Sequence, residues 1–337
     1  MADSVTEKLR AEAKKALAEK KLNCIIGYSG ERNPVPSFAE CEEDIDSLLF
    51  SPLCASSLVT YLVDEILGSK DKKPVGIVVK GCDSKAIVQL LNENIISRDD
   101  VFIFGVPCRG VIDRRKLEKM LVEECGSASA DDCRTDGDKV VCKRDGKYAE
   151  FPMCDFFYDR CLQCSSRNPV IFDLLLSEKV SEGAENYNEV EAIEKKLPEE
   201  RWKFWEDAFS SCVRCHACKK ACPLCYCEEC VADPTRVVVK PDTTAEDKAA
   251  RPKWVERSPI LSENLVYHLT RALHMAGRCT DCGECERVCP QRLPLRKLTK
   301  KVGKDVKAMF GYEAGKKVGQ KPLVALSETS DDNEFIM

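Results

Sequence analysis

The sequence predicts an α/β domain built on a parallel open sheet, followed by a loop-rich α+β domain of the ferredoxin-like kind. Short apolar segments alternate with helical patterns in the first half of the chain, and cysteines recur at a fixed spacing in the second half. A polar segment without cysteine separates the two halves. With 337 residues, the chain has the length of about two domains.

The first half predicts strands and helices in alternation, and this order favours parallel pairing of the strands. Its apolar positions recur at helical spacing in the longer segments and form short continuous runs in the others. The elements expected here are helices at 3–20, 56–67, 84–94 and 113–124 and strands at 22–28, 75–80 and 101–106. A hairpin is expected at 139–151, with its turn at Asp145-Gly146.

The domain boundary is expected in the cysteine-free polar segment. The predicted parts are an α/β domain over 1–180, a helical linker over 181–210, a two-cluster ferredoxin-like domain over 211–300 with an insertion at 223–278, and a C-terminal tail over 301–337. Further helices are expected at 199–209 and 261–275.

Composition excludes several classes of protein. The chain has 52 basic and 57 acidic residues, and a net charge of −5 argues against the basic face that nucleic-acid binding needs. No apolar run is long enough to span a membrane. The charged N-terminal segment lacks the apolar core of a secretory signal, so a cytoplasmic location is expected.

The 22 cysteines are the most informative feature of the composition, with eleven before residue 165 and eleven after residue 211. Disulfide scaffolds are mostly short and secreted, whereas this chain is long and shows no export signal. Metal sites are the better interpretation. Because the chain has three histidines, the ligands of these sites must be almost entirely thiolates.

Two cysteine runs match the spacing of bacterial ferredoxins, proline included. The first run is Cys212, Cys215, Cys218 and Cys222, followed by Pro223; the second run is Cys279, Cys282, Cys285 and Cys289, followed by Pro290. Three cysteines two residues apart wrap one face of a cuboidal cluster, and the fourth points to the neighbouring cluster. The predicted ligands are therefore Cys212, Cys215, Cys218 and Cys289 for one [4Fe–4S] cluster and Cys279, Cys282, Cys285 and Cys222 for another.

Other metal sites explain these two runs less well than [4Fe–4S] clusters do. Structural zinc prefers separated pairs of cysteines, without a third cysteine at the same pitch. Cys212-Val-Arg-Cys215-His216 also matches the attachment pattern of c-type haem, but the cluster accounts better for both thiols. Three further cysteines, Cys225, Cys227 and Cys230, follow the first run; they are candidate ligands of an additional cluster or of zinc, or inert neighbours.

A third cluster is predicted at the carboxyl edge of the sheet, where ligands bind in open α/β folds. Cys82 and Cys108 each follow an expected strand, and Cys161 and Cys164 come from a downstream loop. The alternative is that Cys82 and Cys108 are small buried side chains. Should one ligand differ, Cys133, Cys142 and Cys154 are the substitutes. Lys80 and Arg109 are candidate contacts of a flavin or another anion, or solvated charges.

The same residues carry a family resemblance. The strings Lys80-Gly-Cys-Asp, Val106-Pro-Cys and Cys161-Leu-Gln-Cys resemble the beta-subunit family of F420-reducing hydrogenases and formate dehydrogenases. The second half, at 278–290 and 310–315, looks like that of bacterial members found beside heterodisulfide-reductase-like or hydrogenase modules. The resemblance implies a subunit, with FAD as an expected cofactor, that passes electrons between a two-electron carrier and clusters.

The resulting expectation is an iron–sulfur electron-transfer subunit of a cytoplasmic oxidoreductase complex. Its partner would be a hydrogenase, formate dehydrogenase or heterodisulfide-reductase-like subunit. One alternative is a flavin-bearing catalytic subunit that oxidises or reduces F420 or NAD(P)H, and a remote one is a zinc-ribbon interaction protein. No catalytic residue is predicted, since no nucleophile–base or paired-carboxylate pattern stands out.

Overall fold

The chain forms two compact units in a computed structural model. The structure describes residues 2–20, 22–68, 73–125, 133–144, 147–227, 230, 232, 244–246, 255 and 258–326. The first unit comprises Met1–Val88 and Asn94–Asn186, and the second comprises Gln89–Glu93 and Tyr187–Met337. No helix among the described residues has the length and apolar character needed to cross a membrane.

A six-stranded sheet forms the centre of the first unit. Its strands are β1 (Ile25–Ser29), β2 (Val35–Ala39), β3 (Leu48–Leu49), β4 (Val75–Val79), β5 (Val101–Gly105) and β9 (Leu174–Leu175). The order is β2-β1-β4-β5-β9, and β3 also pairs with β1. The pairs β1–β4, β4–β5 and β5–β9 are parallel, whereas β2 and β3 run antiparallel to β1.

The parallel sheet is therefore confirmed for the three predicted strands, which are β1, β4 and β5, and β9 adds a fourth parallel strand that was not predicted. An entirely parallel sheet is wrong, because β2 and β3 run antiparallel. The physical reason is the length of the connection: β1 ends at Ser29 and β2 begins at Val35, and so short a turn joins antiparallel strands, because a parallel crossover needs a dozen or more residues. Gly30 sits in this turn with φ of +90°, a conformation that glycine adopts without strain.

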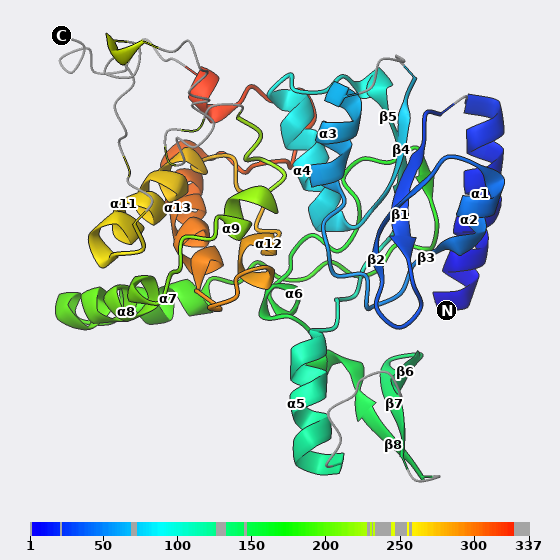
Figure 1. Ribbon diagram of the computed structural model, residues 1–337, viewed down its shortest axis with the longest axis horizontal. Helices are drawn as coiled ribbons and strands as arrows, with labels where there is room; N and C mark the ends of the chain where they lie inside the picture. The colour runs from blue at the N-terminus through cyan, green and yellow to red at the C-terminus, as the bar shows by residue number, and fades with distance from the viewer. Residues whose placement is uncertain are drawn as a thin grey trace. The chain divides into compact units, whose positions relative to one another are not determined.

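Helices cover both faces of the sheet, which explains why every residue of β4 is buried. Figure 1 shows α1 and α2 on one face and α3 and α4 on the other. These helices are α1 (Ala2–Lys20), α2 (Glu42–Ser47), α3 (Val59–Gly68) and α4 (Gly81–Asn92). Leu9, Ala13 and Ala16 recur at helical spacing on the buried side of α1, as the sequence pattern predicts.

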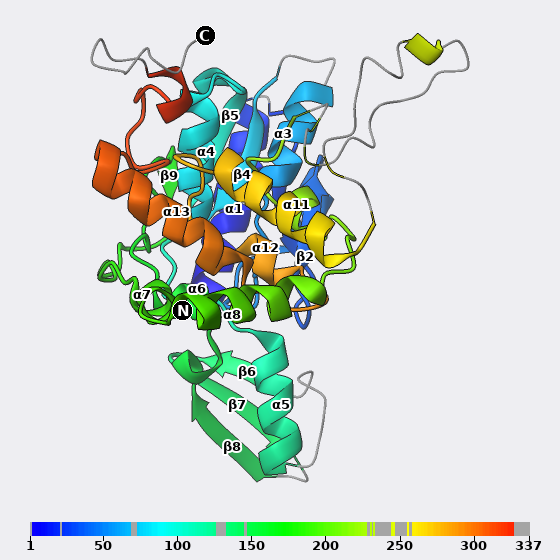
Figure 2. The same ribbon diagram turned by 90° about the vertical axis from the view of Figure 1, so that its left-hand side faces the viewer.

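A small helix-and-sheet module follows β5. It contains α5 (Arg114–Cys125), β6 (Cys133–Asp136), β7 (Lys139–Arg144) and β8 (Lys147–Pro152), with a short helix α6 (Asp159–Leu162) after it. The three strands pair antiparallel in chain order, so the expected hairpin is confirmed, while its turn at 145–146 lies outside the described residues. Figure 2 shows α5 on one face of this sheet, where Leu117, Leu121, Val140 and Phe156 share a hydrophobic core.

A disulfide in this module corrects one expectation. Cys133 on β6 and Cys142 on β7 are direct partners in the strand register, and they are bonded to each other. Both were considered as substitute cluster ligands, which is wrong, because a sulfur held in this bond is not available as a thiolate ligand.

The described residues of the second unit form helices and no β-strand. These helices are α7 (Asn188–Glu194), α8 (Pro198–Ser210), α9 (Ala217–Lys220), α11 (Leu261–His274), α12 (Glu284–Arg287) and α13 (Leu295–Phe310). The strands implied by an α+β domain are thus not seen in this part. Helix α11 packs against α8 and α13, and α13 extends into the region expected to be a tail.

Candidate metal centres

The two cysteine runs fold into the same local backbone. Two positions of each run have left-handed backbone. At the first position, Arg214 and Asp281 have φ of 54° and 58°; at the second, His216 and Gly283 have φ of 60° and 68°. Each pair of left-handed residues is followed by a short helix, α9 in the first run and α12 in the second. Two dissimilar sequences therefore make one kind of loop.

The first thiol group combines three cysteines of the first run with one of the second. Cys212, Cys215, Cys218 and Cys289 line one cavity, together with Arg214, His216, Tyr267, His268, Leu293 and others. Burial raises the pKa of Cys212 and Cys218, and electrostatic interaction with Cys289 raises both further. These four side chains therefore lie together, in the crossed arrangement expected from the two runs.

The second thiol group is Cys222 with Cys279, Cys282 and Cys285. Burial raises the pKa of the last three thiols, and each also interacts electrostatically with Cys222. For Cys222 itself, a hydrogen bond with Cys225 raises the pKa first and burial second. The fourth cysteine of each run thus lies with the first three of the other.

Backbone N–H groups point at several of these sulfurs. Leu293 N lies 3.4 Å from Cys289 Sγ, and the amides of Arg214 and Asp281 donate to Cys212 and Cys279. Such donors stabilise negative charge on sulfur, whether on a free thiolate or on a metal-bound one.

The third thiol group lies in the first unit, at the carboxyl edge of β4 and β5. Cys82 is in the first turn of α4, directly after β4, and Cys108 follows β5. Cys82 interacts electrostatically with Cys164, and Cys108 with both Cys161 and Cys164. Burial raises the pKa of Cys108 to about 12. The four side chains expected to share this edge are therefore near one another.

Glycines allow the loop that carries Cys164 to approach this edge closely. A Cβ atom added to Gly81 would lie 2.0 Å from Ser166 O, and one added to Gly183 would lie 1.9 Å from Cys164 O. The backbone of Cys108 also donates to Arg167 O at 2.8 Å. No side chain larger than hydrogen fits at either glycine without displacing the loop.

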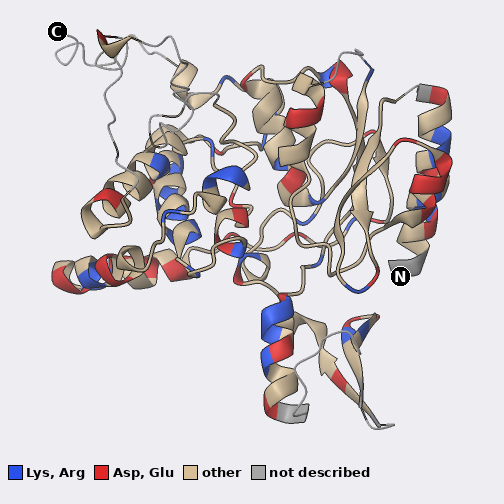
Figure 3. Ribbon diagram, in the orientation of Figure 1, with Lys and Arg blue, Asp and Glu red and all other residues tan. Residues whose placement is uncertain are grey.

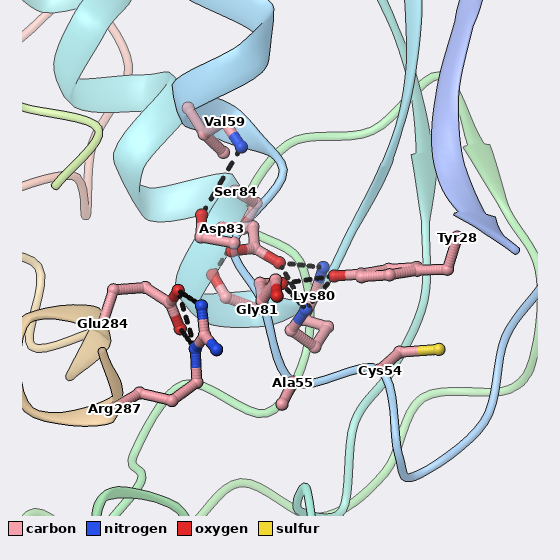
Figure 4. Close-up of polar contacts among 12 residues, drawn as sticks. Tyr28, Cys54, Ala55, Val59, Lys80, Gly81, Asp83, Ser84, Glu284 and Arg287 are labelled. Carbon is pink, nitrogen blue, oxygen red and sulfur yellow. Dashed lines mark hydrogen bonds and ion pairs between the residues drawn. The ribbon is translucent and has the colours of Figure 1, made fainter. Parts of the chain in front are cut away.

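Lys80 lies beside this group in a buried polar cluster (Figure 4). Its Nζ is 2.5 Å from Tyr28 Oη, 3.0 Å from Ser56 O and 3.0 Å from Asp83 Oδ2. Three acceptors match the three N–H bonds of an ammonium group. Burial opposes the positive charge, but Asp83 and Tyr28 outweigh burial and hold the pKa of Lys80 well above its usual value. This cation interacts with Cys82 and Cys108 and would offset negative charge there.

The remaining candidates have separate surroundings. Arg109 is half-exposed and pairs with Asp138 at 3.0 Å. Cys154 is exposed, next to Asp155. Among the cysteines that follow the first run, Cys225 hydrogen-bonds with Cys222, which lowers the pKa of Cys225 to about 7, whereas Cys227 is exposed and Cys230 packs against the hydrophobic core around Phe209.

A single metal ion and a cluster place different demands on four thiolates. In a tetrahedral site with Zn–S bonds of about 2.3 Å, the sulfurs lie about 3.8 Å apart. In the part of the chain that the structure describes, no three His, Cys, Asp or Glu side chains are arranged to hold a metal ion. A cuboidal cluster holds its four thiolates further apart, because iron and sulfide atoms lie between them. The two kinds of site therefore differ in the spacing that they require of the four sulfurs.

Sequence reasoning missed the side chains that surround the sulfurs. Helix α11 contributes Tyr267, His268 and Arg271, and α13 contributes Arg296 and Thr299, which contact the second run. The available signal was the spacing of polar residues along 261–275, a helix that was predicted but given no role.

Comparison with known proteins places these sites in context. The chain is 23% identical over 343 residues to the F420-dependent formate dehydrogenase subunit beta of Methanocaldococcus jannaschii, covering 86% of this chain and 85% of that protein. It is 23% identical over 339 residues to the F420-dependent formate dehydrogenase 1 subunit beta of Methanococcus maripaludis, covering 83% and 82%. No family model matches the chain.

A chain of the F420-reducing [NiFe] hydrogenase complex from Methanosarcina barkeri is also similar, with a TM-score of 0.38 and 18% identity over 49% of this chain and 63% of that one. A TM-score this low does not establish a common fold. The two sequence relatives match the family predicted from the sequence. Both are archaeal, so the bacterial type expected from the second half is wrong.

Proposed function

Because the chain is similar to two formate dehydrogenase beta subunits over most of its length, we propose that it is an iron–sulfur electron-transfer subunit of a multi-subunit oxidoreductase of this family. The three thiol groups each hold one [4Fe–4S] cluster in this proposal. When bound, such a cluster accepts and releases single electrons at a potential that its surroundings set.

One observation carries the proposal: Cys212, Cys215, Cys218 and Cys289 line a single cavity, although the last comes from a different run. A structural role for these cysteines as small apolar side chains would not require four of them at one cavity. The spacing of the runs and the crossed grouping of their side chains support the same ligand set.

The protein's part is to hold the ligands and balance their charge. Four thiolates carry four negative charges, which is costly in a buried site unless donors and cations offset them. Backbone amides donate hydrogen bonds to the sulfurs of the two runs. The positive charge of Lys80 offsets negative charge in the first unit, and that of Arg271 does so in the second. For Arg271, burial opposes the charge, but four nearby thiols led by Cys222 outweigh it and raise the pKa.

The names of the relatives suggest the rest of the complex. They are subunits of F420-dependent formate dehydrogenases, so we propose a dehydrogenase or hydrogenase subunit as partner and F420 as the two-electron carrier of the complex. The F420 dependence in these names favours a second candidate function, in which this chain itself exchanges electrons with F420. Its cofactor would be FAD, which the family resemblance implies. Tightly bound flavin in the pure protein distinguishes this candidate from a relay subunit.

Metal and flavin analysis of one anaerobic sample tests the proposal. We expect about twelve irons and twelve sulfides per chain, four for each cluster, and little zinc. Cys285→Ser should lower both values by about four. Cys41→Ser is the matched control, because Cys41 is exposed and lies outside the three thiol groups.

About eight irons in the wild-type protein would remove the sheet-edge cluster and leave the two runs. Zinc without iron or sulfide would overturn the proposal in favour of a zinc-binding protein. Equal iron in the two cysteine variants would contradict the assignment of Cys285.

A further inference from the structure

Helix α11 has a polar buried side. Asn264, Tyr267, His268 and Arg271 recur at the spacing of one helix face and are each no more than 6% exposed. Buried helix faces are usually apolar, since unpartnered polar groups cost free energy in the interior. The buried polar groups of α11 therefore need partners, and most of the partners that the structure gives them lie in the first cysteine run.

Two of these side chains reach sulfur atoms. His268 Nε2 is 3.3 Å from Cys212 Sγ, and Tyr267 Oη is 3.7 Å from Cys218 Sγ. A tyrosine hydroxyl, and an imidazole protonated at Nε2, donate a hydrogen bond to a thiolate, which has no hydrogen to donate.

The other two hold the run in place. Asn264 Nδ2 donates to Phe209 O at 3.0 Å and to Cys212 O at 2.9 Å. Arg271 Nη2 donates to Cys218 O at 3.1 Å, and its charge interacts with thiols of both groups, including Cys222 and Cys285. Arg271 is thus a cation shared by the two groups, whereas Tyr267 and His268 act on the first.

The rings are also fixed in orientation. The imidazole of His268 stacks on Phe209 with centroids 4.8 Å apart and an interplanar angle of 12°. The guanidinium of Arg214 lies over the ring of Tyr267, 4.5 Å from its centroid. Donors held this way keep their direction toward sulfur when the charge on sulfur changes.

The two runs differ in charge. The first contains three Lys or Arg residues and no acid between its outer cysteines, and α9 is basic in Figure 3. The second contains Asp281, Glu284 and Glu286 and one base, Arg287. Arg296 and Lys300 pair with Asp281, and Arg287 pairs with Glu284, so part of this negative charge is offset. The first thiol group keeps the more positive surroundings.

We propose that α11 sets the reduction potential of the cluster bound by Cys212, Cys215, Cys218 and Cys289, and makes it the more easily reduced cluster of the second unit. The inference rests on the cluster assignment proposed above. Reduction adds negative charge to the cluster and its sulfurs, so donors and cations around them stabilise the reduced form and raise the potential. Tyr267 and His268 are positioning residues of this cluster, and Arg271 raises both potentials.

A redox titration of the anaerobic full-length chain, followed by electron paramagnetic resonance, tests this inference. Cys282→Ser assigns the signals, because it removes the second cluster alone. In the wild type we expect the first cluster to be reduced at the higher potential. His268→Phe should then change its reduced-to-oxidised ratio at least tenfold toward the oxidised form, a fall of about 59 mV for one electron, and leave the second cluster unchanged.

Matched variants separate this effect from a general disturbance. His274→Phe makes the same substitution at an exposed position of the same helix and should leave both potentials unchanged. His268→Gln restores a donor and should recover part of the shift. Arg271→Met should lower both potentials. If His268→Phe fails to assemble its cluster, Tyr267→Phe, which removes one hydroxyl and keeps the ring, gives the decisive titration.

The two proposals fail in different ways. No iron or sulfide in the wild-type protein would overturn the cluster assignment. Two normal clusters whose potentials are the same in Tyr267→Phe, His268→Phe and His274→Phe would overturn the role of α11 and leave the cluster assignment standing. A second cluster that is reduced before the first in the wild type would contradict the predicted order.

Discussion

The thiol groups of the two units are assembled by different means. In the second unit, three of the four cysteines in each group come from one short loop, whose left-handed residues fix their spacing. In the first unit, the four cysteines come from three separate segments of the chain. Cys82 follows β4, Cys108 follows β5, and a downstream loop brings Cys161 and Cys164 to the same sheet edge. Local backbone geometry therefore determines the first kind of site, and the tertiary fold determines the second.

The largest expected effect tests whether the runs share their ligands. Cys289→Ser should remove the cluster of the first run, and Cys222→Ser that of the second, because each is grouped with thiols of the other run. Each variant should lose about four irons and a different paramagnetic signal. Cys215→Ser identifies the signal of the first run's cluster, and Cys282→Ser identifies that of the second. If each run instead bound its own cluster, Cys289→Ser would remove the signal of the second run and Cys222→Ser that of the first.

The next effect concerns the ion pair beneath the sheet-edge group. Asp83→Asn leaves the ammonium of Lys80 buried without its counter-charge and should destabilise the first unit by about 3–5 kcal/mol. Asp138→Asn breaks the exposed Arg109 pair and should cost less than about 1 kcal/mol. Urea unfolding of the full chain measures both, and equal costs would contradict the buried role of Lys80.

The same pair has a defined pH dependence. The pKa of Lys80 in the folded chain lies above its ordinary value of 10.5, so folding is stabilised below that pH. This contribution should be lost as the pH rises above 10.5 toward the folded-state pKa, and it should be absent in Asp83→Asn. Unfolding free energies measured between pH 8 and pH 11 in both proteins check the sign.

A moderate effect on stability and iron content is expected at the sheet-edge thiol group, because the tertiary fold brings its cysteines together. Gly81→Ala places a methyl group against the Ser166 carbonyl and should cost about 1–3 kcal/mol or displace the loop that carries Cys164. We expect loss of the sheet-edge cluster with both run clusters retained. Gly68→Ala, where no atom lies within 4 Å of the added carbon, is the matched control. Loss of all clusters would contradict the independence of the two kinds of site.

The smallest effect on iron is expected from the disulfide. Cys133→Ala combined with Cys142→Ala should leave the iron content unchanged, since these two sulfurs are bonded to each other. Iron and sulfide analysis beside the wild-type protein measures this. A loss of about four irons would restore one of them as a ligand.

The comparison also explains what the sequence could predict. Ligand sets within a run follow from residue spacing, and Cys82 and Cys108 could be placed because each follows a strongly apolar strand. The strands β3 and β9 have two residues each, too few for a periodic pattern, and they were missed. The boundary expected at residue 300 divides helix α13, in which Leu295 and Thr299 are buried before this boundary and Val306 after it.

Partners in tertiary structure were beyond sequence reasoning. The contact of His268 with Cys212 joins residues 56 positions apart, and nothing in either local pattern indicates it. Lys80 was considered as a contact for an anionic cofactor, yet its three donors are directed at Tyr28, Ser56 and Asp83. Such pairings depend on which faces of the elements meet, which spacing alone does not specify.

Anomalous diffraction at the iron edge from anaerobically grown crystals would test the central claim most directly, because it locates iron relative to each cysteine. The account predicts one iron centre within each thiol group, with Cys289 beside the cluster of the first run and Cys222 beside that of the second. Iron centres bound by four cysteines of a single run, or zinc in place of iron at these groups, would contradict it.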